Sequence, residues 1–217
     1  MESLKKYKKT LILTSIVMLL PILVGVLLWD RLPEQVATHF DFEGNPNGWT
    51  GKGFTVFGIP LVLLACQWFA VVATLSDPKH KNLSEKVFKL IFWIVPVSTL
   101  LLAFICYGYE LGYSTSSGTI AFGIMGFFFL VIGNYLPKCR QNYTVGIKIP
   151  WTLHDEENWN HTHRMAGYLW IGGGVLMIIN IFLKWNWLAV VVIAAAVLVP
   201  TLYSYLYYRK HGNCKED

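Results

Sequence analysis

The stretch LILTSIVMLLPILVGVLLW, residues 11–29, decides the fold class. It holds 19 residues without a charged side chain, and it lies between the polar segments LKKYKKT and DRLPE. A helix that crosses a bilayer needs roughly 20 predominantly apolar residues. Pro21 does not exclude such a helix, because neighbouring helices can satisfy the backbone groups that a proline frees. The stretch therefore predicts a membrane-spanning helix.

Five further stretches share this character. Of the 217 residues, 54% are hydrophobic and only 14% are charged, whereas soluble domains carry about 25% charged residues. We therefore predict an all-α integral membrane protein, folded as one polytopic membrane domain over residues 1–217. Its six transmembrane helices are expected at residues 10–29, 54–75, 87–107, 118–136, 165–183 and 187–207.

Basic residues predict the orientation, since cytoplasmic loops carry an excess of Lys and Arg. With six spans, both termini and the second and fourth connections share one side. That side holds 15 of the 18 Lys and Arg residues, and the other side holds Arg31, Lys52 and Lys184. We therefore predict that both termini are cytoplasmic. Anionic lipid at the inner leaflet explains the net charge of +5 without a nucleic-acid partner.

The long outer loop, residues 30–53, has a local pattern of its own. VATHFDF, residues 36–42, alternates with a period of two and predicts a short extended segment, with Val36, Thr38, Phe40 and Phe42 on one side. Asn-Pro and Asn-Gly at residues 45–48 then predict turns. Candidate binding residues in this loop are His39, Asp41, Asn47, Gly48, Trp49 and Lys52. Trp49 is also expected to anchor the start of the second span at the membrane surface.

The long inner loop, residues 137–160, leads into IPWTLHDEENWNHTHR, residues 149–164. Pro150 disfavours helix at Ile149. Thr152 can then cap a helix beginning near Leu153, with acidic residues in the first turn, where the helix dipole favours them. In such a helix His154, Glu157 and His161 share a face and could ligate a zinc-like ion. Their capping and pairing roles make a structural explanation the stronger one, so we predict no metal and no cofactor.

No nucleophile motif or phosphate-binding glycine loop accompanies these residues, so an enzyme is not predicted. A small transporter or lipid-handling protein remains an alternative. Each half reads as helix, long loop, helix, helix, which is the layout of a 3+3 inverted repeat. Gln67, deep in the second span, is the polar side chain on which a transport function would depend.

Two motifs resemble a known family. LP…THFDFEGNPNGWTGK resembles a domain of unknown function, DUF1648, and assigns residues 1–86 to a first helical hairpin. NYTVGIKIPWTLHDEENWNHTHR resembles the SdpI family and assigns residues 118–210 to a second half. Lys148 and Ile149 stand where the family usually has Arg and Thr. The family motif falls on Asn142, Gly146, Lys148, Pro150, Trp151, Thr152, Glu157, Trp159, Thr162, His163 and Arg164.

The resemblance implies a bacterial cell-membrane protein that gives immunity to a secreted antimicrobial peptide toxin of the SdpC type. It also implies a signalling role, in which the protein holds a cytoplasmic repressor at the membrane when toxin is present. The outer loop would then meet the toxin, and the inner loop would meet the repressor.

Overall fold

The computed structural model describes residues 2–41, 44–113, 117–185 and 187–211. It is mostly helical, and the six predicted spans are confirmed as helices long and apolar enough to cross a membrane. The chain is a multi-pass membrane protein. The long helices are α1 (Glu2–Leu27), α2 (Ile59–Ser76), α3 (Glu85–Glu110), α4 (Ser117–Tyr135), α6 (Glu156–Leu183) and α7 (Trp187–His211).

Shorter elements join these helices. They are the strands β1 (Gln35–Phe40) and β2 (Pro46–Gly51), the helix α5 (Pro150–His154), a π-helical turn at Phe54–Gly58, and 3₁₀ turns at Trp29–Arg31, His80–Asn82 and Leu136–Lys138. The prediction of an all-α protein was therefore wrong in one detail. β1 and β2 pair antiparallel, because the alternating segment finds a partner strand within the same loop.

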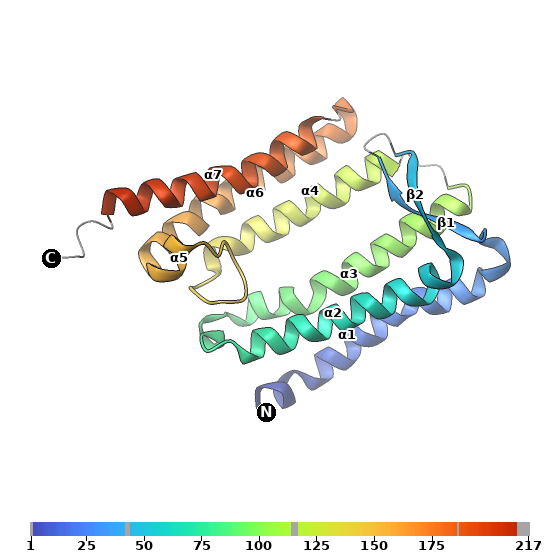
Figure 1. Cartoon of the computed structure of the whole chain (residues 1–217), viewed down its shortest axis with the longest axis horizontal. Coiled ribbons are helices and arrows are strands. Elements are labelled where there is room, and N and C mark those ends of the chain that lie inside the picture. The colour runs from blue at the N-terminus through green and yellow to red at the C-terminus, as the bar shows by residue number, and fades with distance from the viewer. Residues whose placement is uncertain (1, 42–43, 114–116, 186, 212–217) are drawn as a thin grey trace. The chain divides into compact units, whose positions relative to one another are not determined.

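The chain folds as two compact units. The first comprises Met1–Leu75 and Phe88–Ile120, and the second comprises Ser76–Val87 and Ala121–Asp217. The first unit holds α1, α2, most of α3 and the β-hairpin, and the second holds most of α4 with α5, α6 and α7 (Figure 1). Each unit therefore contains three spanning helices.

Glycines set the packing of α4 against α6 in the second unit. A Cβ on Gly126 would lie 2.9 Å from the carbonyl oxygen of Gly174, and one on Gly133 would lie 3.0 Å from that of Gly167. Both pairs are seven residues apart on their helices, so the same faces meet twice. Small residues commonly allow helix backbones to approach closely in membranes. Of the glycine run at residues 172–174, Gly174 takes part in this packing, whereas an added Cβ on Gly172 would meet nothing within 4 Å.

Two prolines inside helices have their freed carbonyls satisfied by neighbouring side chains. Pro96 lacks the N–H that would reach the Phe92 carbonyl, and Gln67 Nε2 donates to that oxygen at 3.0 Å. Pro200 likewise frees the Ala196 carbonyl, to which Trp170 Nε1 donates at 3.2 Å. These bonds join α2 to α3 and α6 to α7, and they meet the requirement that backbone groups inside a membrane be hydrogen-bonded.

Candidate functional site

The inner loop and the start of α6 form one folded site in the second unit, which we call the inner-loop site (residues 139–164). Asn142 organises its first part and is fully buried. Its amide nitrogen donates to the carbonyls of Arg140 and Val145 at 2.8 and 2.9 Å, and its amide oxygen accepts from the backbone N–H groups of Thr144 and Val145 at 2.8 and 2.7 Å. The side chain thus makes hydrogen bonds to backbone groups before and after it in the loop, and these bonds fix the loop's conformation.

Trp159 and His163 form the buried floor of the inner-loop site. They lie one turn apart on α6 and stack with their ring centroids 4.0 Å apart. Trp159 Nε1 donates to the Cys139 carbonyl at 2.7 Å. His163 Nε2 accepts from the Ile147 N–H at 2.9 Å, so its proton sits on Nδ1, which donates to the Trp159 carbonyl at 2.8 Å. Both ring nitrogens have partners, and His163 therefore holds the loop as a neutral side chain.

Gly146 is the point at which the loop crosses this floor. Its φ is +125°, and an added Cβ would overlap His163 Nε2 and lie 2.9 Å from the Trp159 ring. Only glycine combines that backbone conformation with so close an approach. The glycine of the motif is therefore explained by packing against two other motif residues.

Thr152 closes the far end of the loop. Its hydroxyl accepts from the Ile149 N–H at 3.1 Å and donates to the Ile147 carbonyl at 2.7 Å. The expectation that Thr152 caps a continuous helix from Leu153 was wrong. α5 ends at His154, and Asp155 has extended backbone (φ −132°, ψ 114°) and caps α6, accepting at Oδ1 from the Glu157 and Asn158 N–H groups.

The break at Asp155 also separates the three candidate metal ligands. His154 lies on α5, where its Nδ1 is 2.8 Å from the Pro150 carbonyl. Glu157 and His161 lie together on α6, with Oε1 and Nε2 3.9 Å apart. In the described parts of the chain, no three His, Cys, Asp or Glu side chains gather as a metal site. The shared helical face that motivated a zinc ion is absent because the three residues belong to two helices.

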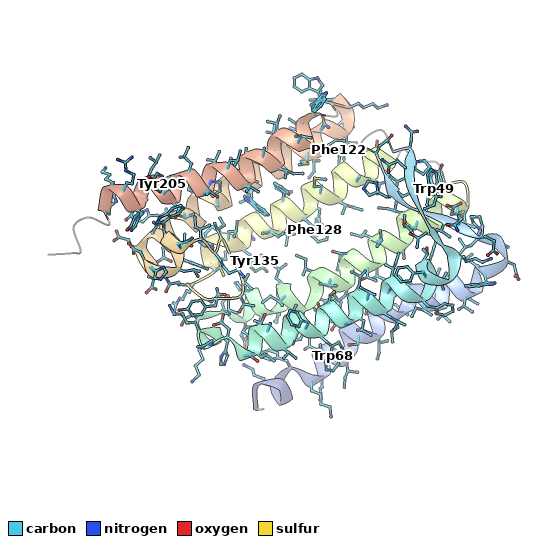
Figure 2. The ribbon with its side chains drawn as sticks, in the orientation of Figure 1. Trp49, Trp68, Phe122, Phe128, Tyr135 and Tyr205 are labelled. Carbon is cyan, nitrogen blue, oxygen red and sulfur yellow. The ribbon has the colours of Figure 1, made fainter. Side chains whose placement is uncertain are left out.

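The remaining motif residues lie on the surface of the inner-loop site. Lys148 is exposed, and its Nζ donates to the Tyr143 carbonyl at 3.3 Å. Pro150, Glu157 and Arg164 are also exposed. Trp151 is half-buried against α7, with its ring centroid 5.1 Å from that of Tyr205, which Figure 2 labels on that helix. The motif thus divides into buried residues that shape the loop and exposed residues that are free to meet a partner.

Sequence reasoning missed a group of residues that fastens this loop to the connection between α2 and α3. Asp77 is buried and accepts from the Tyr143 N–H at 2.8 Å and from the Thr144 hydroxyl. Gln141 accepts from Lys79 Nζ at 2.6 Å. Burial raises the pKa of Asp77, but hydrogen bonds from Thr144 and from the backbone of Lys79 and Tyr143 outweigh it, so the pKa is lowered overall. The residues that make these contacts are far apart in the sequence, and no local sequence pattern predicts that they meet.

A second missed group joins α6 to α7. Asn158, Thr162 and Ser204 are fully buried. Asn158 Oδ1 accepts from the hydroxyls of Thr162 and Ser204 at 3.0 and 2.8 Å, and Asn158 Nδ2 donates to the Ser204 carbonyl at 3.0 Å. The spacing of four between Asn158 and Thr162 was the available signal, because it puts both on one helix face. Thr162 of the motif therefore bonds to Asn158, and Asn158 is held by Ser204 of α7.

On the predicted outer side, the β-hairpin carries the other candidate residues. The extended segment is confirmed over Gln35–Phe40, and Phe42 lies outside the described residues. The turns predicted at residues 45–48 were wrong. Asp41 Oδ1 accepts from the Asn45 N–H at 2.8 Å and begins the turn earlier, so residues 46–51 form β2. A proline is tolerated at Pro46 because the first residue of a strand need not donate.

Exposed residues on this hairpin are interspersed with buried and half-buried ones. His39 and Asn47 are exposed and hydrogen-bonded to each other through Nδ1 and Oδ1. Gly48 lies opposite His39, and Trp49, seen on the hairpin in Figure 2, is 57% exposed. The exposed set forms a small polar and aromatic surface on the predicted outer side.

The hairpin is fixed to the helices beneath it. Lys52 is buried, and its Nζ pairs with Glu34 Oε1 at 2.9 Å and lies 4.8 Å from the centre of the Trp29 ring. Glu110, at the end of α3, accepts from the Ala37 N–H at 2.8 Å. Lys52 is therefore a structural residue of the hairpin and not part of its exposed surface.

Comparison with known proteins gives one family match for each of the two regions described above, the inner-loop site and the β-hairpin. Residues 138–204 match the SdpI/YfhL protein family, and residues 16–64 match the domain of unknown function DUF1648. Along the chain, the DUF1648 match precedes the SdpI/YfhL match. The first match contains the inner-loop site, and the second contains the β-hairpin.

A curated relative extends the likeness to nearly the whole chain. The immunity protein SdpI of Bacillus subtilis (strain 168) is 29% identical over 207 residues, which are 92% of this chain and 96% of that protein. No solved structure gave a significant match.

Proposed function

We propose that this protein is a membrane immunity protein that protects its cell from a secreted antimicrobial peptide toxin of the SdpC type. The observation that carries the proposal is the 29% identity to an immunity protein, spread over 92% of this chain. Both elaborated loops lie within family matches. The relative is an immunity protein, and we propose no catalytic activity, metal or cofactor for this chain.

The β-hairpin is the proposed toxin-facing surface. His39, Asn47 and Trp49 are exposed on it, while Glu110 holds it to α3 and Lys52 holds it to the turn at Trp29–Arg31. An exposed tryptophan on a rigid support is the kind of residue that commonly anchors a partner. A ligand that approaches from outside would meet this surface first, given the orientation that the basic residues predict.

The inner-loop site is the proposed contact for a cytoplasmic repressor. Its exposed Lys148 and Arg164 give it basic side chains, and the buried Trp159 and His163 hold those side chains on a defined frame. Signalling would require that toxin binding favour one of two states of the protein with different affinity for the repressor. Arg164 is the better residue to change, because removing His163 would also release the loop.

Toxin challenge tests the proposal directly. A sensitive Bacillus strain without its own immunity gene should survive an SdpC-type toxin when it expresses this protein. The matched variant for comparison is Trp49→Ala, which alters the exposed surface of the hairpin and leaves the hairpin's contacts with the helices in place. Killing that is unchanged by the wild-type protein would contradict the proposal for that toxin.

The signalling role has a separate test. The repressor should co-purify with the wild-type protein from toxin-treated cells and not from untreated cells. Arg164→Ala should reduce its recovery while protection against toxin is kept. Equal recovery of repressor with and without toxin would remove the signalling role and leave immunity standing.

The transporter alternative rests on Gln67, whose amide oxygen is buried and has no hydrogen-bond partner in the described part of the chain. The amide nitrogen of Gln67 satisfies the Phe92 carbonyl inside the α2–α3 packing. The 3+3 repeat stays a prediction, since two units of three spans do not by themselves establish an inverted relation between them.

A further inference from the structure

A pocket of about 310 Å³ lies between α1 and α3 in the first unit. None of its ten described lining residues is charged, and its surface is almost wholly apolar. Pro21 and Val24 line it from the last two turns of α1, and Gly108 and Tyr113 line it from the end of α3 and just beyond. Because Glu110 joins that end of α3 to the β-hairpin, the pocket lies at the hairpin end of the unit.

Tyr107 connects this pocket with the support of the hairpin. Its hydroxyl donates to the Pro21 carbonyl at 3.3 Å, across the pocket wall. Its ring packs in the buried cluster that contains Val36 of β1 and Val56 of the turn before α2. A group that enters the pocket would therefore contact Tyr107, the same side chain that packs against the β-hairpin.

We propose that this pocket receives an apolar segment of the secreted peptide toxin, and the inference rests on the function proposed above. The pocket volume is at the lower end of the range for ligand sites, about 300–1,000 Å³, which suits a few large apolar side chains. Its described lining residues include no cation that could hold a phospholipid phosphate. Its continuity with the hairpin through Tyr107 allows one peptide to contact the exposed hairpin surface and fill the pocket together.

Gly108 permits a steric test with little disturbance of the fold. It lines the pocket, and an added Cβ there would meet nothing within 4 Å. Gly108→Phe should fill the space and lower the toxin dose that kills half the cells by at least tenfold relative to wild type. The control is Gly172→Phe, another helical glycine with open space at its Cβ, and it should protect as wild type does.

Photocrosslinking identifies the occupant without altering Gly108. Phe104 lines the pocket and is 66% exposed, and Phe182 on α6 is 83% exposed but lines no part of it. Each would be replaced by p-benzoylphenylalanine in protein reconstituted into phosphatidylglycerol–phosphatidylethanolamine nanodiscs, with an SdpC-type toxin as the probe. We expect a toxin adduct, detected by mass spectrometry, at position 104 and none at position 182.

The outcomes separate the pocket from the general function. If wild type and Gly108→Phe protect equally well, the pocket proposal is wrong and the immunity function stands. The same conclusion follows if the only adducts at position 104 are lipid adducts. If wild type gives no protection, the proposed function fails and the pocket inference fails with it. If Gly108→Phe extracts poorly or aggregates on size-exclusion chromatography, the adduct at position 104 decides the matter.

Discussion

Replacing Gly146 with alanine tests how the inner-loop site is held together. The new methyl group would overlap His163 Nε2 and lie 2.9 Å from the Trp159 ring, at a backbone φ of +125°. Neither ring has room to retreat. Both are buried and stacked 4.0 Å apart, and each is hydrogen-bonded to the loop backbone. The substitution must therefore displace the loop.

The magnitude follows from two terms. A non-glycine residue held in an unfavourable backbone region costs about 1–3 kcal/mol. Moving the loop breaks the bond from the Ile147 N–H to His163, and a buried N–H left without a partner costs about 1–3 kcal/mol. Together they destabilise the protein by about 2–6 kcal/mol, a large part of a typical stability of about 5–15 kcal/mol. At about 2–4 °C per kcal/mol for a chain of this size, the melting temperature should fall by roughly 10 °C.

The assay is the monodisperse fraction of detergent-purified protein on size-exclusion chromatography after heating. Gly172→Ala is the matched control, since its new Cβ meets nothing within 4 Å and alanine favours a helix over glycine by about 1 kcal/mol. We expect Gly172→Ala to melt at or slightly above wild type. A Gly146→Ala protein that melts within about 2 °C of wild type would show that the loop does not depend on this contact.

Two other substitutions test single interactions. Gln67→Leu should destabilise the wild-type protein by about 1 kcal/mol, because the Phe92 carbonyl loses its donor while the substitution also removes the Gln67 amide oxygen, which is buried without a partner. In a Pro96→Ala background the helix regains an N–H for that carbonyl, so the same substitution should have little effect; equal losses in both backgrounds would refute the pairing. Asp77→Asn should lower the melting temperature near neutral pH. The folded-state pKa of Asp77 is lowered, so its contribution is present above the unfolded pKa of about 3.9 and is lost as the pH falls through the lower folded value. The difference from wild type should thus shrink in strongly acidic buffer, and a difference that grows there would contradict the assignment.

The six spans could be predicted from the sequence because a span depends on a sum over about 20 residues. Residues 11–29 show why, since no single contact is needed to place that helix. The inner-loop site is different, because its shape depends on particular long-range bonds. Asp77 reaches Thr144 across 67 residues, and nothing in the local sequence of either residue reveals the other.

The start of α6 was misplaced for a local reason. Thr152 and Asp155 are both good capping residues, so a helix could begin at either of them. The structure uses both, with Thr152 inside the short α5 and Asp155 as the cap of α6. The bond from Trp159 Nε1 to the Cys139 carbonyl is a tertiary contact across 20 residues, and the local sequence does not reveal it.

Gln67 shows why a buried polar residue in a membrane helix is ambiguous from sequence. Such residues are functional candidates by default, yet a proline on another helix creates an equal need for a hydrogen-bond donor. Pro96 predicts that the Phe92 carbonyl is unsatisfied, since that carbonyl lies four residues before it. The sequence therefore contains both the donor and the acceptor, but not their proximity. Trp170 and the carbonyl freed by Pro200 repeat the arrangement in the second unit. A proline within a span should thus be paired with the polar side chains of neighbouring spans before any of those side chains is assigned to a transport path.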